Sequence, residues 1–200
     1  RVLNVRSPAM KKLPLLLLAL AACVKNPIIM KDGALPAAPS ASQATLVIAQ
    51  SFTYPAVNVV DDKGKLVAQV GPRQHTVVGV PAGPIKLAAF PGTRPDMGDR
   101  VLGTVEAGKV YYLAIGFRMG GITLQNIAER HSKEDWAGRK TYVTDLAPVT
   151  MDAARVGEVE AALGEGRAGI FNEIDGEVNG WAEDEKKVRI IEAADGDAAP

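Results

Sequence analysis

The pattern of apolar and polar positions changes twice along the chain of 200 residues. A continuous apolar run occupies residues 13–22, residues 24–45 contain few bulky apolar side chains, and short β-branched runs separated by turn residues begin at Leu46. Short runs of this kind, recurring about every ten residues, are typical of a β-sandwich or a small barrel. The pattern therefore predicts a mainly β domain.

The β-branched runs predict a series of strands joined by tight turns. We expect strands at residues 45–52, 56–60, 65–70, 75–80, 85–90, 101–106 and 110–117, with weaker candidates at 121–127 and 140–149. The connections are rich in Gly, Pro and Asp, as in Asp61-Asp62-Lys63-Gly64, and such residues favour hairpin turns. The expected fold is an immunoglobulin- or transthyretin-like antiparallel β-sandwich over residues 46–150.

The region after the sandwich is predicted to be helical. Val156, Val159 and Leu163 are spaced three and four positions apart, which places them on one helix face, and Asp152 is placed to cap that helix. We expect this face to cover a sheet edge or an open end of the sandwich. Residues 178–191 predict a second helix, and the acidic end after it is expected to be disordered. Residues 151–200 would thus form a helical, acidic C-terminal extension.

The apolar run near the start has the features of a secretory signal. Lys11 and Lys12 precede the run, small residues end it, and Cys23, the only cysteine of the chain, follows directly. A transmembrane helix is the alternative, but ten residues at about 1.5 Å each cover only half of a hydrocarbon core of about 30 Å. We therefore expect an export signal within residues 1–22, with Met10 as the true start and an upstream extension before it.

The residues Leu20-Ala21-Ala22-Cys23 resemble the lipobox of bacterial lipoproteins. The resemblance implies that Cys23 is lipidated, that cleavage occurs just before it, and that the mature protein begins there. Several acyl chains give a lasting tether, because each buried CH₂ contributes about 0.8 kcal/mol. A buried structural cysteine beside an unrelated apolar helix is the alternative. Residues 23–45 are expected to form a flexible linker with a mean reach of roughly 25 Å.

Three stretches of the β region resemble PEGA-type and carboxypeptidase-regulatory-like sandwich domains of small bacterial lipoproteins. They are residues 61–70, 77–90 and 105–115. The chain departs from the usual Pro-Pro-Gly turn of these domains by having Pro81-Ala82-Gly83, and it lacks a clear Asp-Gly at the first turn. The resemblance covers about residues 46–117 and implies the fold, since such domains share no catalytic site.

Composition and charge narrow the function classes. Hydrophobic residues make up 47% of the chain but aromatic residues only 5%, so we expect a core of mainly Val, Leu and Ile. The formal net charge of zero hides an acidic region, because residues 151–200 hold 13 acidic and 5 basic side chains. Nucleic-acid binding needs a basic face to neutralise phosphates, so no nucleic-acid partner is expected. A single cysteine cannot form a disulfide within the chain.

The sequence contains no catalytic motif that we can identify. It has no Gly-x-Ser-x-Gly run and no phosphate-binding glycine loop. His131 with the acidic residues of 129–135 could form a metal cluster, but a solvated loop is the simpler interpretation. We interpret His75 as an exposed side chain at a strand start, and Asp61 and Asp62 as turn residues instead of calcium ligands. We therefore expect no metal, no cofactor and no enzymatic activity.

Four residues outside the strong strands are candidate partner contacts. Trp136 and Trp181 are the only tryptophans, and Trp is enriched at interface hot spots. Packing of each Trp as a local plug under a loop or helix is the alternative. Arg94 and Asp96 belong to the charged loop 91–100, which is the best candidate for a specific surface, with a solvated connector as the alternative.

Together these features favour an envelope lipoprotein. The leading hypothesis is a protein anchored to the membrane through Cys23 that acts as a non-enzymatic structural or interaction module and contacts an unidentified envelope protein. Val24, instead of Asp, follows the cysteine, which is compatible with the outer membrane and a domain facing the periplasm or the exterior. One alternative is a periplasmic carrier or chaperone, which a deep apolar cavity between the sheets would favour. Another is an envelope hydrolase, which needs carboxylates or a Ser-His pair in one cleft.

Overall fold

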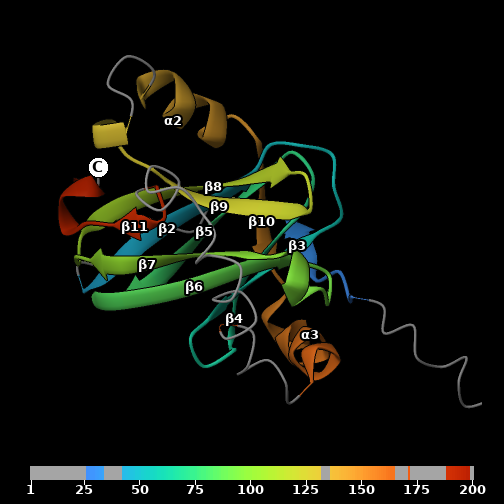
Figure 1. The fold of residues 1–200 in the computed structure, drawn as a ribbon. Coiled ribbons are helices and arrows are strands. Elements are labelled where there is room, and N and C mark those ends of the chain that lie inside the picture. Colours follow the sequence, from blue (N-terminus) through green and yellow to red (C-terminus); the bar gives the residue numbers. More distant parts are fainter. Residues whose placement is uncertain (1–25, 34–41, 132–135, 165–170, 172–187, 199–200) are drawn as a thin grey trace, which may run out of the picture.

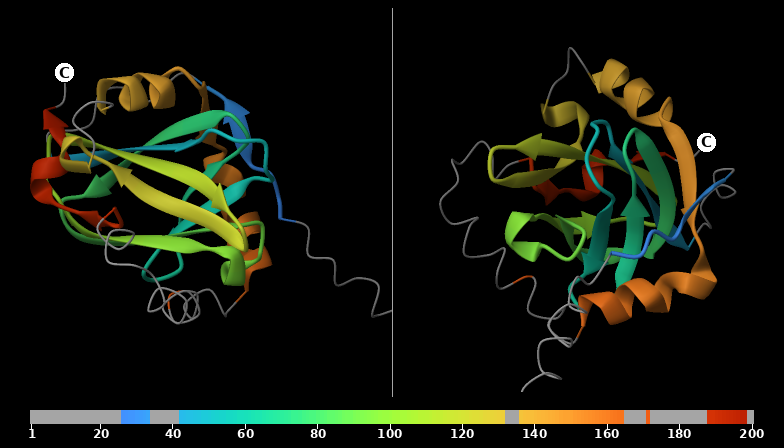
Figure 2. Two further views of the ribbon diagram at one scale, coloured as in Figure 1. Left: turned by 45° about the horizontal axis from the view of Figure 1, so that its top comes forward. Right: turned by 90° about the vertical axis from the view of Figure 1, so that its right-hand side faces the viewer.

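Two β-sheets pack face to face, and one helix lies on the outer side of each sheet (Figures 1 and 2). The predicted mainly β sandwich with a helical region towards the C-terminus is confirmed. The computed structural model describes residues 26–33, 42–131, 136–164, 171 and 188–198.

The first sheet brings together segments from the start, the middle and the end of the chain. In its described part the spatial order is β1 (Met30–Asp32), β10 (Ala147–Met151), β5 (Gln74–Pro81), β2 (Gln43–Gln50), β8 (Lys109–Arg118) and β12 (Asp197–Ala198). The strand β9 (Gly121–Ile127) also pairs with β8. The hairpin pairs are antiparallel as predicted, whereas β2 with β8 and β10 with β5 are parallel pairs between segments distant in the sequence.

The second sheet contains the two central hairpins of the sequence. Its described order is β11 (Ile190–Ile191), β7 (Asp99–Val105), β6 (Gly83–Pro91), β3 (Val57–Asp61) and β4 (Leu66–Val70). The β3–β4 turn forms as predicted, because the carboxylate of Asp61 accepts hydrogen bonds from the backbone amides of Lys63 and Lys65 and Gly64 adopts a φ of 73°. The predicted strands between residues 45 and 127 are thus confirmed, with small differences at their ends.

The core follows the alternation of side chains along the strands. In β2, Leu46 and Ile48 point into the main cluster between the sheets, whereas Val47 and Ala49 point to the outer face of the first sheet. Successive strand residues face opposite sides, and β2 is buried on both of them. The strand therefore needs cover on its outer face.

Two helices supply the outer cover. The helix α2 (Trp136–Thr144) places Val143 on the outer face of the first sheet. The helix α3 (Val156–Leu163) places Val159 on the outer face of the second sheet, against Val60 and Phe90. The predicted apolar helix face is therefore confirmed, but it covers a sheet face and not an edge or an open end. In the described part of the chain, neither helix has the length and apolar character needed to cross a membrane.

The strand expected at residues 140–149 is wrong in its first half. Its β-branched residues suggested a strand, yet Thr141, Val143 and Thr144 belong to α2. Val143 and Leu146 are buried on the first sheet in this arrangement. Burial against the sheet outweighs the weak local propensity of β-branched residues.

The flexible linker and the disordered C-terminus are also corrected. Residues 26–33 enter the fold, with Met30–Asp32 as β1, although residues 23–45 were expected to be a spacer. Ile190–Ile191 form β11 instead of part of a helix, and Asp197–Ala198 form β12 instead of a disordered end. These segments are ordered because they complete sheet edges and bury side chains such as Ile29 and Ile191.

Candidate functional site

The described residues contain no group of three His, Cys, Asp or Glu side chains that could hold a metal ion. His75 is buried, so the prediction of an exposed side chain is wrong. Its Nδ1 lies 2.8 Å from the carbonyl oxygen of Leu146, next to the pairing of His75 with Pro148 in β10. His75 therefore joins β5 to the segment that follows α2.

The structure brings two of the predicted site residues together. Arg94 and Asp96 form an exposed ion pair at the turn η2 (Pro95–Met97), with 2.6 Å between Nη2 and Oδ2. The hydrogen bond from Arg94 lowers the pKa of Asp96. Trp136 begins α2, but its side chain lies outside the described residues, as do Trp181 and Cys23. Their predicted roles stay predictions.

Residues 26–33, which we call the N-terminal strap, are held by buried amide side chains. The Gln69 side chain acts like a peptide unit, because its Oε1 accepts from the amide of Ile29 at 2.8 Å and its Nε2 donates to the carbonyl of Pro27 at 2.9 Å. The same Nε2 donates to Asn58, whose Nδ2 donates to Asn26 at 2.9 Å. Gln69 and Asn58 are both fully buried. The side chains of Gln69 and Asn58 thus link the second sheet to the strap.

The other side of the strap is fixed by β10 and η4 (Ala153–Arg155). β1 pairs antiparallel with β10, and the amide of Asp152 donates to the carbonyl of Ile29 at 2.8 Å. Lys31 forms an ion pair with Asp152 at 2.7 Å, and Arg155 donates to the carbonyl of Ile28 at 3.0 Å. The strap is therefore bound from both sides.

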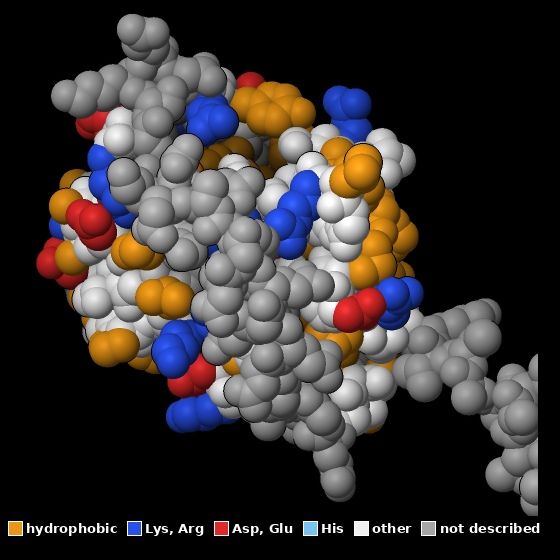
Figure 3. Space-filling model, in the orientation of Figure 1, with side chains coloured by type: hydrophobic (Ala, Val, Ile, Leu, Met, Phe, Trp, Pro, Cys, Tyr) orange, Lys and Arg blue, Asp and Glu red, His pale blue; other side chains and the backbone are white. Residues whose placement is uncertain are grey.

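One end of the sandwich exposes aromatic side chains. Residues 51–55, 91–98 and 117–121 form this aromatic end. The rings of Phe52, Tyr54 and Phe117 lie 5.4–6.1 Å apart between centroids. In Figure 3 hydrophobic side chains gather along the right-hand side, where β8 ends in Figure 1.

The tip of the aromatic end projects from the fold. Phe117 is 58% exposed, and Met119 in the β8–β9 turn is 98% exposed. A shallow pocket of about 310 Å³ lies beside them, between Tyr54, residues 91–94 and Asn26. The N-terminal strap therefore enters the fold at the aromatic end.

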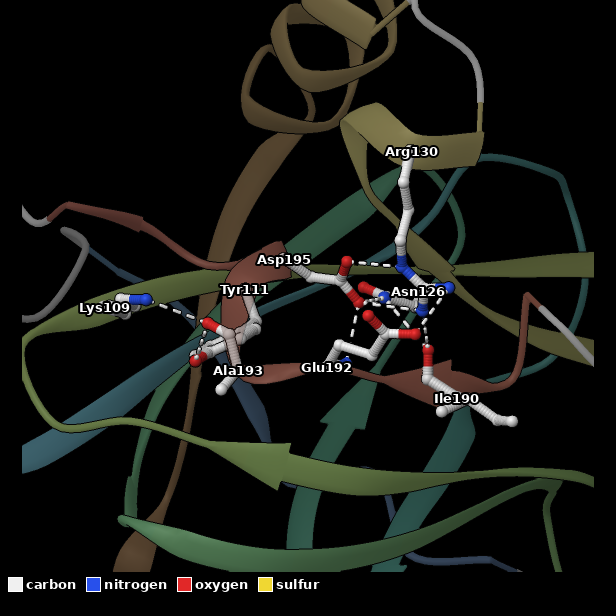
Figure 4. Close-up of polar contacts among 8 residues, drawn as sticks. All are labelled: Lys109, Tyr111, Asn126, Arg130, Ile190, Glu192, Ala193 and Asp195. Carbon is white, nitrogen blue, oxygen red and sulfur yellow. Dashed lines mark hydrogen bonds and ion pairs between the residues drawn. The ribbon is translucent and has the colours of Figure 1, made fainter.

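The opposite end of β8 carries a polar network, which we call the polar end (Figure 4). Asp195 of η6 (Ala193–Asp195) accepts from Arg130 at 2.6 Å, from Asn126 at 2.6 Å and from the amide of Glu192 at 2.8 Å. Burial alone would raise the pKa of Asp195, but these hydrogen bonds and the charge of Arg130 hold that pKa below its ordinary value. The network holds the C-terminal segment, residues 188–198, onto the sandwich.

Tyr111 extends the polar end into the core. Its ring is fully buried, while its hydroxyl accepts from the amide of Glu106 at 2.9 Å and donates to the carbonyl of Ala193 at 3.2 Å. Lys109 donates to the same carbonyl at 2.9 Å. The start of β8 is therefore tied to η6 by two side chains.

A second ion pair holds the start of the C-terminal segment. Arg189 donates from Nε to both carboxylate oxygens of Asp99, at 2.8 and 2.9 Å. The Asp99 side chain is 0% exposed and also accepts from the amide of Leu124 at 2.9 Å. Burial raises the pKa of Asp99, although Arg189 and the backbone amides act in the opposite direction. The pKa values of Asp99 and Asp195 thus move in opposite directions, because burial outweighs the pairing at Asp99 but not at Asp195.

A groove opens at the rim between the two sheets. It has a volume of about 480 Å³ and is lined by apolar side chains such as Val67, Val78 and Ile85 and by charged ones such as Asp62 and Lys86. The interior behind it is filled by the main apolar cluster.

Sequence reasoning missed the residues that hold the two terminal segments, although one signal was present. Asn58 and Gln69 are the amide residues of two otherwise apolar strands, and the hairpin pairs them directly. Two facing amides in buried strands require polar partners. Nothing local to the strap indicated that it would be that partner.

Comparison with known proteins adds little to this picture. No family model matches the chain, and no curated protein matches it. A solved structure described as the NMR structure of the protein from Eubacterium rectale is similar to 46% of this chain and 92% of its own, with 17% sequence identity and a TM-score of 0.26. A match with so low a TM-score and sequence identity supports no conclusion about function.

Proposed function

We propose that this protein is a membrane-anchored envelope lipoprotein whose mature part is a non-enzymatic structural or protein-interaction module. The observation that carries the proposal is the position of the single thiol, Cys23, directly after the apolar run 13–22 and its small residues. A lipid attachment point accounts for one cysteine at that place and none elsewhere. Val24 favours the outer membrane as the site of attachment.

The N-terminal strap supports this proposal. The strap begins three residues after Cys23 and is held by Gln69, Asn58 and the pairing of β1 with β10. Contacts on both sides of the strap hold the chain that follows Cys23 to the core. A lipid at Cys23 would therefore keep the domain close to the membrane.

Metabolic labelling with a fatty acid tests the anchor. We expect the wild-type protein to carry the label and to sediment with membranes, and Cys23→Ala to lose the label and to be largely released from membranes. Val24→Ala is the matched control, because it changes the neighbouring residue, keeps the thiol, and should stay labelled. A label that persists on Cys23→Ala would refute the anchor.

Site-specific crosslinking in cells tests the interaction module. A photo-crosslinking residue at Arg94, Asp96, Trp136 or Trp181 should yield a discrete adduct with an envelope protein. The same residue at Lys86, which lines the groove and belongs neither to the charged loop 91–100 nor to α2, serves as the control. The same adduct pattern from the control as from the candidate positions would refute a specific partner at them.

The carrier alternative has one observation in its favour, the groove between the sheets, and one against it, the filled interior behind that groove. If an apolar ligand occupies the groove, Val78→Trp should weaken binding of a hydrophobic fluorescent dye. Lys63→Ala, at the charged margin of the groove, is the control. His75 does not support the hydrolase alternative, because it is buried and its Nδ1 is hydrogen-bonded to the backbone carbonyl of Leu146.

A further inference from the structure

The place where the N-terminal strap enters the fold is also the place where apolar side chains are exposed. Asn26 lines the same shallow pocket as Tyr54 and Arg94. Phe117 contacts Tyr54, and the backbone of Gly121 lies against Met97 in η2. The strap entry and the β8–β9 tip therefore belong to one continuous surface.

Covalent geometry limits how far this surface can lie from Cys23. Asn26 is the third residue after Cys23, and an extended chain covers at most about 3.6 Å for each of these three steps, or about 11 Å in total. A spacer of more than twenty residues was expected after Cys23, but residues 26–33 belong to the fold as the N-terminal strap. Little free chain remains between the anchor and the domain.

We propose that the aromatic end rests in the interfacial layer of the membrane to which Cys23 is anchored, with Phe117 and Met119 inserted among the lipid headgroups. This inference rests on the proposed lipid anchor at Cys23. Aromatic side chains and Met suit this layer, because their apolar parts leave water while polar groups such as the Tyr54 hydroxyl remain hydrated. Arg94 and Asp96 neutralise each other at this end, so insertion requires no separate compensation of their charges.

The proposed membrane contact determines how the domain is oriented relative to the membrane. With the aromatic end in the membrane, β8 runs from the polar end, which faces away from the lipid, to the aromatic end (Figure 1). Its ten residues extend over roughly 30 Å. The groove rim and the C-terminal segment are then presented to the aqueous compartment.

Fluorescence quenching in vesicles tests the contact. The lipidated full-length mature protein is reconstituted into vesicles of phosphatidylethanolamine and phosphatidylglycerol that contain lipids brominated near the headgroup. Met119→Trp adds a fluorophore at the tip of the aromatic end, and Ile190→Trp adds one at a partly exposed position of the C-terminal segment. After subtraction of the signal from the native tryptophans, we expect several-fold stronger quenching for Met119→Trp than for Ile190→Trp.

Equal quenching of both variants in a protein that remains anchored would overturn the inference and leave the anchor intact. The surface can also be tested without the anchor. The mature chain with Cys23→Ala should still bind these vesicles weakly, and adding Phe117→Ser and Met119→Ser should lower the partition constant by about tenfold. Lys86→Ser on the same background should leave it unchanged.

The two experiments separate the two proposals. If fatty-acid labelling fails but the Cys23→Ala chain binds vesicles through Phe117 and Met119, the anchor is refuted and the membrane contact stands. If Phe117→Ser and Met119→Ser do not change vesicle binding, the contact is refuted whatever the state of Cys23.

Discussion

The aromatic end and the polar end of the sandwich lie at the two ends of β8, and they differ in which side chains they expose and which they bury. At the end of β8, Phe117 and Met119 are exposed and the ion pair of Arg94 and Asp96 lies in solvent. At its start, charged groups such as Asp195 are buried and bonded. Buried charges need partners, whereas exposed apolar groups need none for folding. The polar end therefore serves stability, and the aromatic end is free to serve contact.

The largest expected effect is at the buried ion pair of the C-terminal segment. Arg189→Ala leaves Asp99 buried without its cation, which should lower the free energy of unfolding by about 3–5 kcal/mol. Urea unfolding measures this change. Arg94→Ala at the aromatic end is the matched control and should lower the free energy of unfolding far less, because its ion pair is exposed. Similar losses for both variants would erase the distinction between the buried and the exposed ion pair.

A smaller loss is expected when the N-terminal strap is released. Gln69→Leu removes the partner of the Ile29 amide and of the Pro27 carbonyl, and it should cost about 1–3 kcal/mol. Hydrogen exchange at the Ile29 amide should become faster than exchange in β2. Gln43→Ala, at an exposed position, should change stability by less than about 0.5 kcal/mol. Unchanged exchange at Ile29 in Gln69→Leu would show that the strap is held by other contacts.

The two carboxylates of the C-terminal segment should titrate in a defined order. The pKa of Asp99 is raised above the ordinary value of 3.8 and that of Asp195 is lowered below it. Carbon-detected NMR of the side-chain carboxyl groups should therefore show Asp99 taking up its proton at a higher pH than Asp195. The reverse order would contradict the described burial and pairing.

These pKa shifts have opposite consequences for stability. Asp195 contributes stability above pH 3.8 that is lost as the pH falls through its folded-state pKa. Asp99 contributes stability below pH 3.8 that is lost as the pH rises through its raised pKa. The stability difference between the wild type and Asp195→Asn should accordingly shrink on acidification below pH 3.8.

The smallest effect on stability is expected at the tip of the aromatic end. Met119 is 98% exposed, so Met119→Ser should change the free energy of unfolding by less than about 0.5 kcal/mol. Thermal unfolding checks this expectation. A loss of several kcal/mol would mean that the tip supports the fold, and the contrast between the two ends would then fail.

The strands of the sandwich could be predicted because their signal is local. Short β-branched apolar runs such as residues 45–48 and turn residues such as Asp61 and Gly64 specify strands and hairpins without knowledge of distant segments. The helix α3 was predictable for the same reason, since Val156, Val159 and Leu163 mark its buried face in the sequence.

The terminal segments could not be predicted because their order depends on distant partners. Strands β1, β11 and β12 contain two or three residues each, which is too short for any periodic pattern. They form because β10, β7 and β8 present free edges to them. The burial of His75 likewise depends on Leu146 and β10, which lie some seventy residues further along the chain.

The hydrogen bonds from Leu124 and Asn126 affect whether neighbouring copies of the protein can pair through a strand edge. Both backbone amides belong to β9, the long strand that flanks β8, and they donate to Asp99 and to the carbonyl of Val188. An open strand edge is a template on which a neighbouring copy can add its own strand. With these amides already occupied, this part of β9 offers little free edge for pairing between copies. Asp99, which forms the buried ion pair with Arg189, thus also helps to keep neighbouring molecules separate.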